Sequence, residues 1–144
     1  MQMPQIAGPT TPEQIFGSFI NKTGALSIVG RVVMHDIVTA RDGKAVILPT
    51  TAGLSSVVGP MLEAGIPDGS PVLVGMWGIW NTLVKGKVAA GGATVAGNIL
   101  IPVNGEGNLL FSKAATGLDG FATLCDTDVA QDAAAALKKV LWRM

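Results

Sequence analysis

Short apolar segments separated by glycine dominate the second half of this chain. Runs of this length, cut by Gly-Gly, Asn-Gly and Asp-Gly, are typical of β-strands joined by tight turns. Because no amphipathic helix of ordinary length stands between them, the pattern predicts an all-β fold, a compact antiparallel β-barrel or β-sandwich. The candidate strands lie at residues 26–35, 45–48, 56–62, 72–75, 76–80, 98–103, 109–111, 121–124 and 140–142.

The first residues follow a different pattern. Residues 1–11 hold two prolines and a glycine among Gln and Thr, a composition that predicts an extended arm. Thr11, Pro12 and Gln14 then match a helix cap, a first helical residue and a capping-box partner, so one or two helical turns are expected. The sequence thus predicts an arm with a short helical segment over residues 1–24 and a single β domain over residues 25–144. The side chains that would share one face of the helical turn are Ile15, Phe16, Phe19 and Ile20.

The C-terminal segment admits two interpretations. Residues 128–136 are rich in alanine and begin with a capping aspartate, which favours a helix. A continuous helix to the end of the chain would place Leu137, Val140, Leu141 and Met144 on one face. The other possibility is a helical turn followed by a closing strand over residues 137–142.

Three tryptophans are candidates for contacts with another protein, because Trp is large for a small β core and is favoured at interfaces. Strand alternation places Trp77 and Ile79 on one face and Trp80 on the other. One of these two rings then leaves the main core unless the sheet is covered on both sides, or a bulge at Gly78 turns both rings inward. Trp142 lies in the last apolar segment.

The composition favours association rather than binding to nucleic acid or membrane. Only 14% of the 144 residues are charged, against about 25% in ordinary soluble domains. Ten basic residues balance ten acidic ones, so there is no net charge to keep copies apart. No basic run exceeds Lys138-Lys139, so no nucleic-acid partner is expected. The uncharged stretch 88–105 is interrupted by glycine, proline and asparagine, so no membrane helix is expected.

Reactive side chains are scarce, since the chain has one histidine, one cysteine and no tyrosine. His35-Asp36 joins an imidazole to a carboxylate in sequence, but adjacent strand residues point to opposite faces, and no Gly-x-Ser-x-Gly elbow is present. A serine hydrolase would have to recruit Ser27, Ser55 or Ser56 from elsewhere. We therefore expect no enzyme activity and no catalytic residue.

No cofactor or metal site is expected either. Residues 92–97 have the glycine spacing of a phosphate-binding loop but lack the lysine and the Ser or Thr that should follow. Asp126-Thr127-Asp128 lacks the glycine and distal glutamate of a calcium loop. Cys125 stands alone, which excludes an internal disulfide, and we expect it to be a small core residue. No basic residue precedes an apolar block at the N-terminus, so no secretory signal is expected.

Glycines and short strands recur in a set order between about Ile28 and Trp142. The segments are Gly30-Arg31-Val32-Val33, Val57-Val58-Gly59, Ala64-Gly65-Ile66-Pro67-Asp68-Gly69, Val72-Leu73-Val74, Gly78-Ile79-Trp80, Leu83-Val84, Val95-Ala96-Gly97-Asn98-Ile99-Leu100, Gly105-Glu106-Gly107-Asn108-Leu109, Gly120-Phe121-Ala122 and Lys139-Val140-Leu141. In this order they resemble the small capsid cement or decoration proteins of tailed bacteriophages. Asn98 departs from the aspartate common in that family, and the Ala-rich segment before the last strand resembles an inserted helical turn.

The resemblance implies a structural virion protein without a cofactor, which trimerises on the outer surface of an icosahedral head and clamps neighbouring major capsid subunits. Such a chain would be made in the host cytoplasm and end in the virion. The alternatives are another phage subunit, such as a tail-tube or head-completion protein, and a small β-barrel ligand-binding protein or hydrolase that uses the His35 region. The residues expected at interfaces are Pro4, Ile6, Pro9, Trp77, Trp80 and Trp142.

Overall fold

The computed structural model describes residues 13–37, 39, 42–50, 56–85, 97, 100–102, 109–111, 122–126 and 134–143. Every regular element within these residues is a β-strand, so the predicted all-β class is confirmed. None of them belongs to a helix long and apolar enough to cross a bilayer. The strands are β1 (Ile15–Asn21), β2 (Val32–His35), β3 (Ala45–Ile47), β4 (Val57–Pro60), β5 (Pro71–Lys85), β6 (Leu100–Pro102), β7 (Leu109–Phe111), β8 (Ala122–Leu124) and β9 (Ala136–Trp142).

Hydrogen bonds join these nine strands into one sheet, whose main path runs β4-β2-β3-β1-β5-β7-β6. β9 pairs with β5 and with β8, beside this path. Most neighbouring strands are antiparallel, but β1 runs parallel to β3 and β5 runs parallel to β7. The sheet is therefore mixed, and the expectation of a purely antiparallel fold is wrong at these two pairs.

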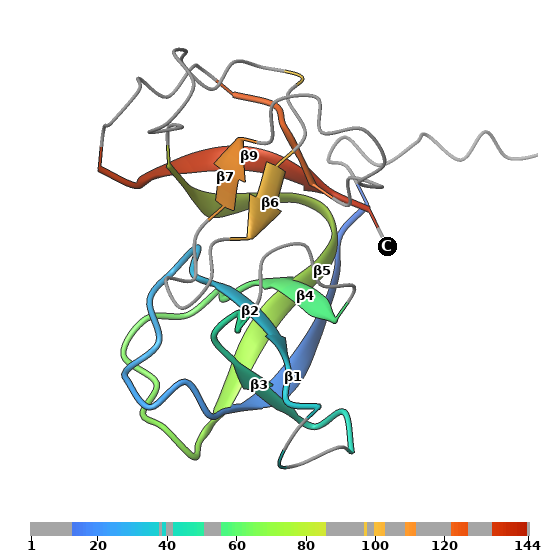
Figure 1. Cartoon of the computed structure of the whole chain (residues 1–144). Helices are drawn as coiled ribbons and strands as arrows, with labels where there is room; N and C mark the ends of the chain where they lie inside the picture. The colour runs from blue at the N-terminus through green and yellow to red at the C-terminus, as the bar shows by residue number, and fades with distance from the viewer. Residues whose placement is uncertain are drawn as a thin grey trace, which may run out of the picture.

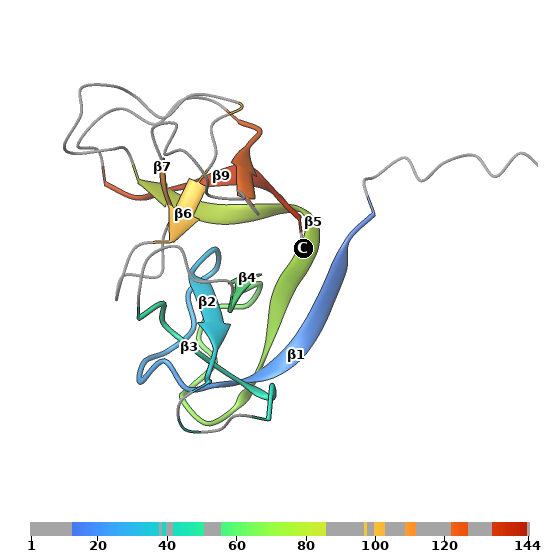
Figure 2. The same ribbon diagram turned by 45° about the vertical axis from the view of Figure 1, so that its right-hand side comes forward.

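Strand β5 is the longest and takes part in both halves of the molecule (Figure 1). Residues 71–77 of β5 pair with β1, and residues 78–84 pair with β9. Figure 2 shows β5 bending between these two parts, so that its first part runs beside β1 and its second part turns toward β9. Strands β1 to β4 consequently gather at one end of the molecule and β6 to β9 at the other.

Residues 15–20 lie in strand β1 and not in the short helix that the sequence predicts. Ile and Phe are favoured in strands, and Gly17 is a poor helix former. The ladder with β5 extends from Ile15 to Ile20, whereas a helix cap contributes only about 1 kcal/mol. Tertiary pairing therefore outweighs the local capping signal. Residues 1–12, which include the predicted arm and most of the cap, lie outside the described residues.

The C-terminal segment ends as strand β9, so the interpretation of a continuous helix is wrong and that of a closing strand is confirmed. Along β9 the side chains alternate, with Leu137 and Lys139 exposed and Val140 and Trp142 in the core on either side of half-buried Leu141. The strand is hydrogen-bonded to β5 on one edge and to β8 on the other. Residues 127–133 lie outside the described residues.

The described residues form two buried apolar clusters. One lies where the two halves meet and contains Val32, Met34, Val57, Val84, Leu100, Ala122, Leu124, Val140 and Trp142. The other lies within the β1 to β5 half and contains Phe19, Val33, Val46, Val58, Met61, Val72 and Val74. Neighbouring residues of β2 and of β4 point into different clusters, so both strands are covered on both faces. This explains why β2 reads Val-Val-Met without polar alternation, as fully buried strands do.

Asn21, at the end of β1, forms hydrogen bonds with the loop after β1 and with the loop before β5. Its side chain is fully buried, with 0% exposure, and its amide nitrogen donates to the carbonyl oxygens of Ala25 at 2.9 Å and Ile66 at 3.0 Å. Its Oδ1 accepts hydrogen bonds from the backbone N–H and the hydroxyl of Thr23, at 3.1 and 2.8 Å. One buried amide thus ties the loop after β1 to the loop before β5.

The end of β4 returns to the first half of β5. Met61 forms an isolated antiparallel bridge with Val74, and the N–H of Leu62 donates to the carbonyl of Leu73 at 2.9 Å. The two backbones come so close that a Cβ at Gly59 would collide with the carbonyl oxygen of Gly75. Only glycine fits at this crossing.

We expect Asn21→Ala to lower the free energy of unfolding by about 3 kcal/mol, because it removes the four hydrogen bonds through which this buried side chain joins the two loops. Urea denaturation measures the change. Asn81→Ala removes the same side chain from an exposed position of β5 and should change stability by less than about 0.5 kcal/mol. Equal effects of the two substitutions would contradict the role assigned to Asn21.

Gly59→Ala should also destabilise the fold by about 3 kcal/mol, because the added methyl group must push β4 away from β5. Gly65→Ala is the matched control, since Gly65 has a φ of 77° but nothing within 4 Å of an added Cβ. Its cost should be limited to backbone strain of about 1 kcal/mol. Thermal unfolding of both variants tests whether the close approach, and not the residue type, sets the cost.

Candidate interaction surface

Three large apolar side chains are exposed where the start of β1 meets the middle of β5. They are Ile15, Phe16 and Trp77, and we call them the aromatic patch. Ile15 lies opposite Trp77 in the ladder and Phe16 lies opposite Gly75, so the register shifts at Met76. Bulges of this kind re-aim side chains, which helps to explain why two consecutive residues of β1 are both exposed.

Trp80 packs against one residue of the aromatic patch, Phe16. Its indole lies against Gly75, where an added Cβ would be 2.7 Å from the ring. The ring meets Phe16 edge to face, with centroids 6.5 Å apart and planes at 88°. Its Nε1–H donates to the carbonyl oxygen of Trp77 at 2.9 Å, and the side chain also packs against the cluster between the two halves. The Phe16 ring is therefore held in place by contact with the fixed Trp80 indole.

The two neighbouring tryptophans differ in burial. Trp77 is exposed, whereas Trp80 is half-buried. The alternative, in which a bulge at Gly78 turns both rings inward, is not observed. Ile15 and Phe16 were missed as surface residues, because the helix interpretation placed them on a packed face. Both residues begin an apolar run and follow the polar Gln14. This position could have indicated that they lie at the surface.

Trp142 occupies a different environment. It is 1% exposed, belongs to the cluster between the two halves, and donates its Nε1–H to the hydroxyl of Thr82 at 3.0 Å. It therefore contributes to the interior of the chain, not to its surface. The other residues predicted at interfaces, Pro4, Ile6 and Pro9, lie outside the described residues.

His35 lies at the end of β2, against the ring of Phe19, with centroids 5.5 Å apart. Its N–H donates to the carbonyl of Ser56, so the two residues are neighbours across the sheet. The Nδ1 of His35 and the hydroxyl of Ser56 are both buried without a hydrogen-bond partner, so they do not form a hydrogen-bonded dyad. Asp36 is buried and accepts the backbone N–H of Thr39 at 2.8 Å.

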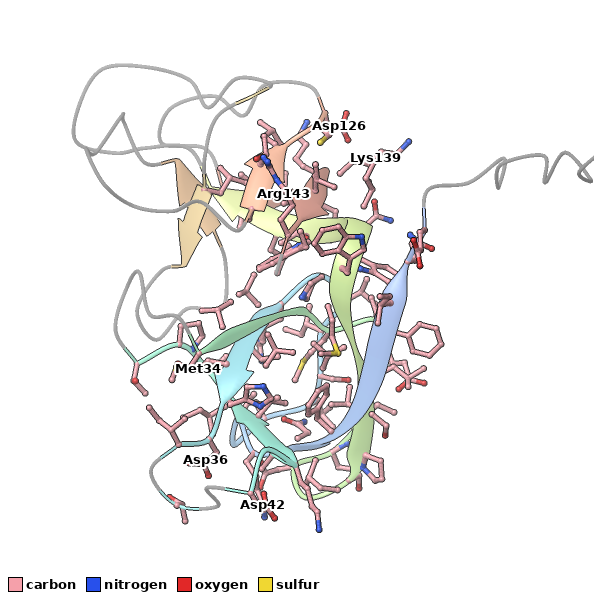
Figure 3. The ribbon with its side chains drawn as sticks, turned by 90° about the vertical axis from the view of Figure 1, so that its right-hand side faces the viewer. Met34, Asp36, Asp42, Asp126, Lys139 and Arg143 are labelled. Atoms are coloured by element: carbon pink, nitrogen blue, oxygen red, sulfur yellow. The ribbon has the colours of Figure 1, made fainter. Side chains whose placement is uncertain are left out.

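The charged residues labelled in Figure 3 occupy two separate regions. Asp126, Lys139 and Arg143 lie near β8 and β9, whereas Asp36 lies near the opposite end of the molecule. The Oδ2 of Asp126 accepts the backbone N–H of Lys139 at 3.1 Å, which gives this carboxylate a role in holding β8 to β9. Within the part of the chain that is described, no three His, Cys, Asp or Glu side chains are grouped to hold a metal ion.

Cys125, expected in the core, is exposed instead. It follows the last residue of β8, and its Sγ lies 3.5 Å from the carbonyl oxygen of Thr123. The preference of unpaired cysteines for burial is a tendency of the residue type. Here the alternation of β8 and the start of the next turn leave the side chain on the solvent side.

Comparison with known proteins does not assign the chain to a family. No protein-family model matches the chain, and no curated protein matches it significantly. The aromatic patch is therefore interpreted from its own geometry.

Proposed function

We propose that this chain is a structural subunit that works by burying its aromatic patch against a neighbouring subunit. The observation that carries the proposal is the exposure of Ile15, Phe16 and Trp77 on a rigid sheet. Large aromatic side chains held in this way dominate the binding energy of protein interfaces. A thinly charged chain with no net charge offers little resistance to such an association.

The setting that we propose is the outer surface of a bacteriophage capsid. This part of the proposal rests on the sequence resemblance to capsid cement and decoration proteins, and the all-β fold of the described residues is compatible with it. In that role the chain would form a homotrimer and clamp neighbouring major capsid subunits. It would act by surface burial and not as an enzyme.

We also propose that the β1 to β5 half is a small closed barrel. The strand order β4-β2-β3-β1-β5, together with the Met61–Val74 bridge between the end of β4 and β5, supports this interpretation. The second half of β5 with β6 to β9 would then cover one side of the barrel. A closed barrel has no free strand edge, which would direct association to side-chain surfaces such as the aromatic patch.

Labelling of intact particles tests the proposed setting. Antibodies against the purified chain should decorate the heads of virus particles made from the genome that encodes it, as seen by electron microscopy. Sedimentation of the purified chain should give a trimer. Labelling of the tail with hexameric rings would favour a tail subunit, and a chain that remains monomeric and labels no particle would overturn the proposal.

Substitution of the patch tests the surface itself. Phe16→Ser and Trp77→Ser should each weaken self-association or particle binding by about 2 kcal/mol, which is about thirtyfold, with little change in the unfolding transition. Ile37→Ser is the matched control, because Ile37 is 53% exposed and Phe16 is 56% exposed, yet Ile37 lies outside the patch. If Ile37→Ser weakened association as strongly, the assignment to β1 and β5 would fail.

A further inference from the structure

A second surface of different chemistry lies on the turn that precedes β2. The N–H of Arg31 donates to the carbonyl of Ile28 at 3.0 Å, which closes the turn. Gly30 fixes the turn to two strands, because its N–H donates to Met61 at 2.8 Å and its carbonyl accepts the N–H of Leu83 at 2.8 Å. Side chains on this turn are therefore presented by a rigid backbone.

Apolar side chains surround the turn. Leu26, which precedes the turn, and Ile28, its first residue, are exposed. Leu137 of β9, also exposed, packs so closely over Gly30 that a Cβ there would meet its Cδ2 atom. We call Leu26, Ile28, Arg31 and Leu137 the Arg31 patch. None of its residues belongs to the aromatic patch.

The guanidinium of Arg31 has few hydrogen-bond partners within the described residues. The side chain is half-buried, and its Nε is buried without a hydrogen-bond partner. Its Nη1 makes a long contact of 3.4 Å to the carbonyl oxygen of Leu26. No carboxylate among the described residues pairs with it. Charged donors that lose water are normally paired, because an unpaired one destabilises the fold.

We propose that the Arg31 patch binds a carboxylate side chain carried on an apolar segment of a partner protein. A carboxylate would pair with the terminal nitrogens of the guanidinium, of which Nη1 makes only the long contact to Leu26, in the geometry that arginine favours. The three apolar side chains would cover the flanking residues of that segment. Arginine within an apolar surround is typical of interfaces, whereas a small free anion would leave Leu26, Ile28 and Leu137 uncovered.

This inference goes beyond the proposed function and does not depend on it. The aromatic patch can bind a partner only by burying apolar surface, whereas the Arg31 patch favours a partner that carries a negative charge. A subunit with two unlike surfaces can bind two different neighbours, as heterologous contacts in an assembly require. Loss of one surface should leave the other intact.

Peptide titration of the isotopically labelled full chain, followed by NMR, tests the proposal. The probes are acetyl-Val-Leu-Glu-Leu-Val-amide and the same peptide with glutamine in place of glutamate. The glutamate peptide should shift the amide signals of Gly30, Arg31 and Leu83 and the Nε–H signal of Arg31. The glutamine peptide should bind about tenfold more weakly. Trp77→Ser should leave this preference unchanged.

Three outcomes would overturn the proposal. They are equal binding of both peptides, no shift with either, and an equal shift of the same signals by inorganic phosphate alone. Arg31→Gln should abolish the preference for glutamate while the chain remains folded.

A second variant separates binding from folding. If the guanidinium serves a partner, Arg31→Met should leave the Tm unchanged or raise it, because the variant removes an unpaired buried donor. The preference for the glutamate peptide should be lost at the same time. A lowered Tm with the preference retained would assign Arg31 to the fold and overturn the proposal.

Discussion

The pairing of one strand with two different partners holds this molecule together. β5 is hydrogen-bonded to β1 along its first part and to β9 along its second part, so the two halves share a continuous backbone. Each half alone would leave a strand without its partner. The cluster between the halves adds the burial of Trp142, Leu124 and Val140 against Val32 and Met34. Cooperative folding of the whole described region is the physical consequence.

Much of this fold could be predicted from local sequence patterns, because the length of each apolar segment and the turn residues between segments indicate where strands begin and end. The all-β class follows from short apolar segments separated by turn residues. The failure at β1 has a definite cause. Thr11, Pro12 and Gln14 form a good capping signal, but the pairing of residues 15–20 with β5 depends on residues far along the sequence. Long-range pairing of this kind leaves no local trace.

The candidate surfaces were harder to predict than the fold. Trp142 and Trp80 share a residue type, yet one lies in the core and the other supports a surface, because their neighbours in space differ. Arg31 carried no signal as a binding residue, since the lack of an ion pair between Arg31 and a carboxylate of the described residues emerges only in three dimensions. Cys125 shows the reverse case, in which a preference of the residue type gave the wrong environment.

The exposed position of Cys125 has a practical consequence. It is the one cysteine of the chain, and it follows β8, which carries no residue of the aromatic patch or of the Arg31 patch. A maleimide reagent would therefore attach a single cargo to each copy, at a residue outside the aromatic patch. Should copies of the chain cover a particle, every copy would offer one chemical handle, and the density of displayed cargo would follow the number of subunits.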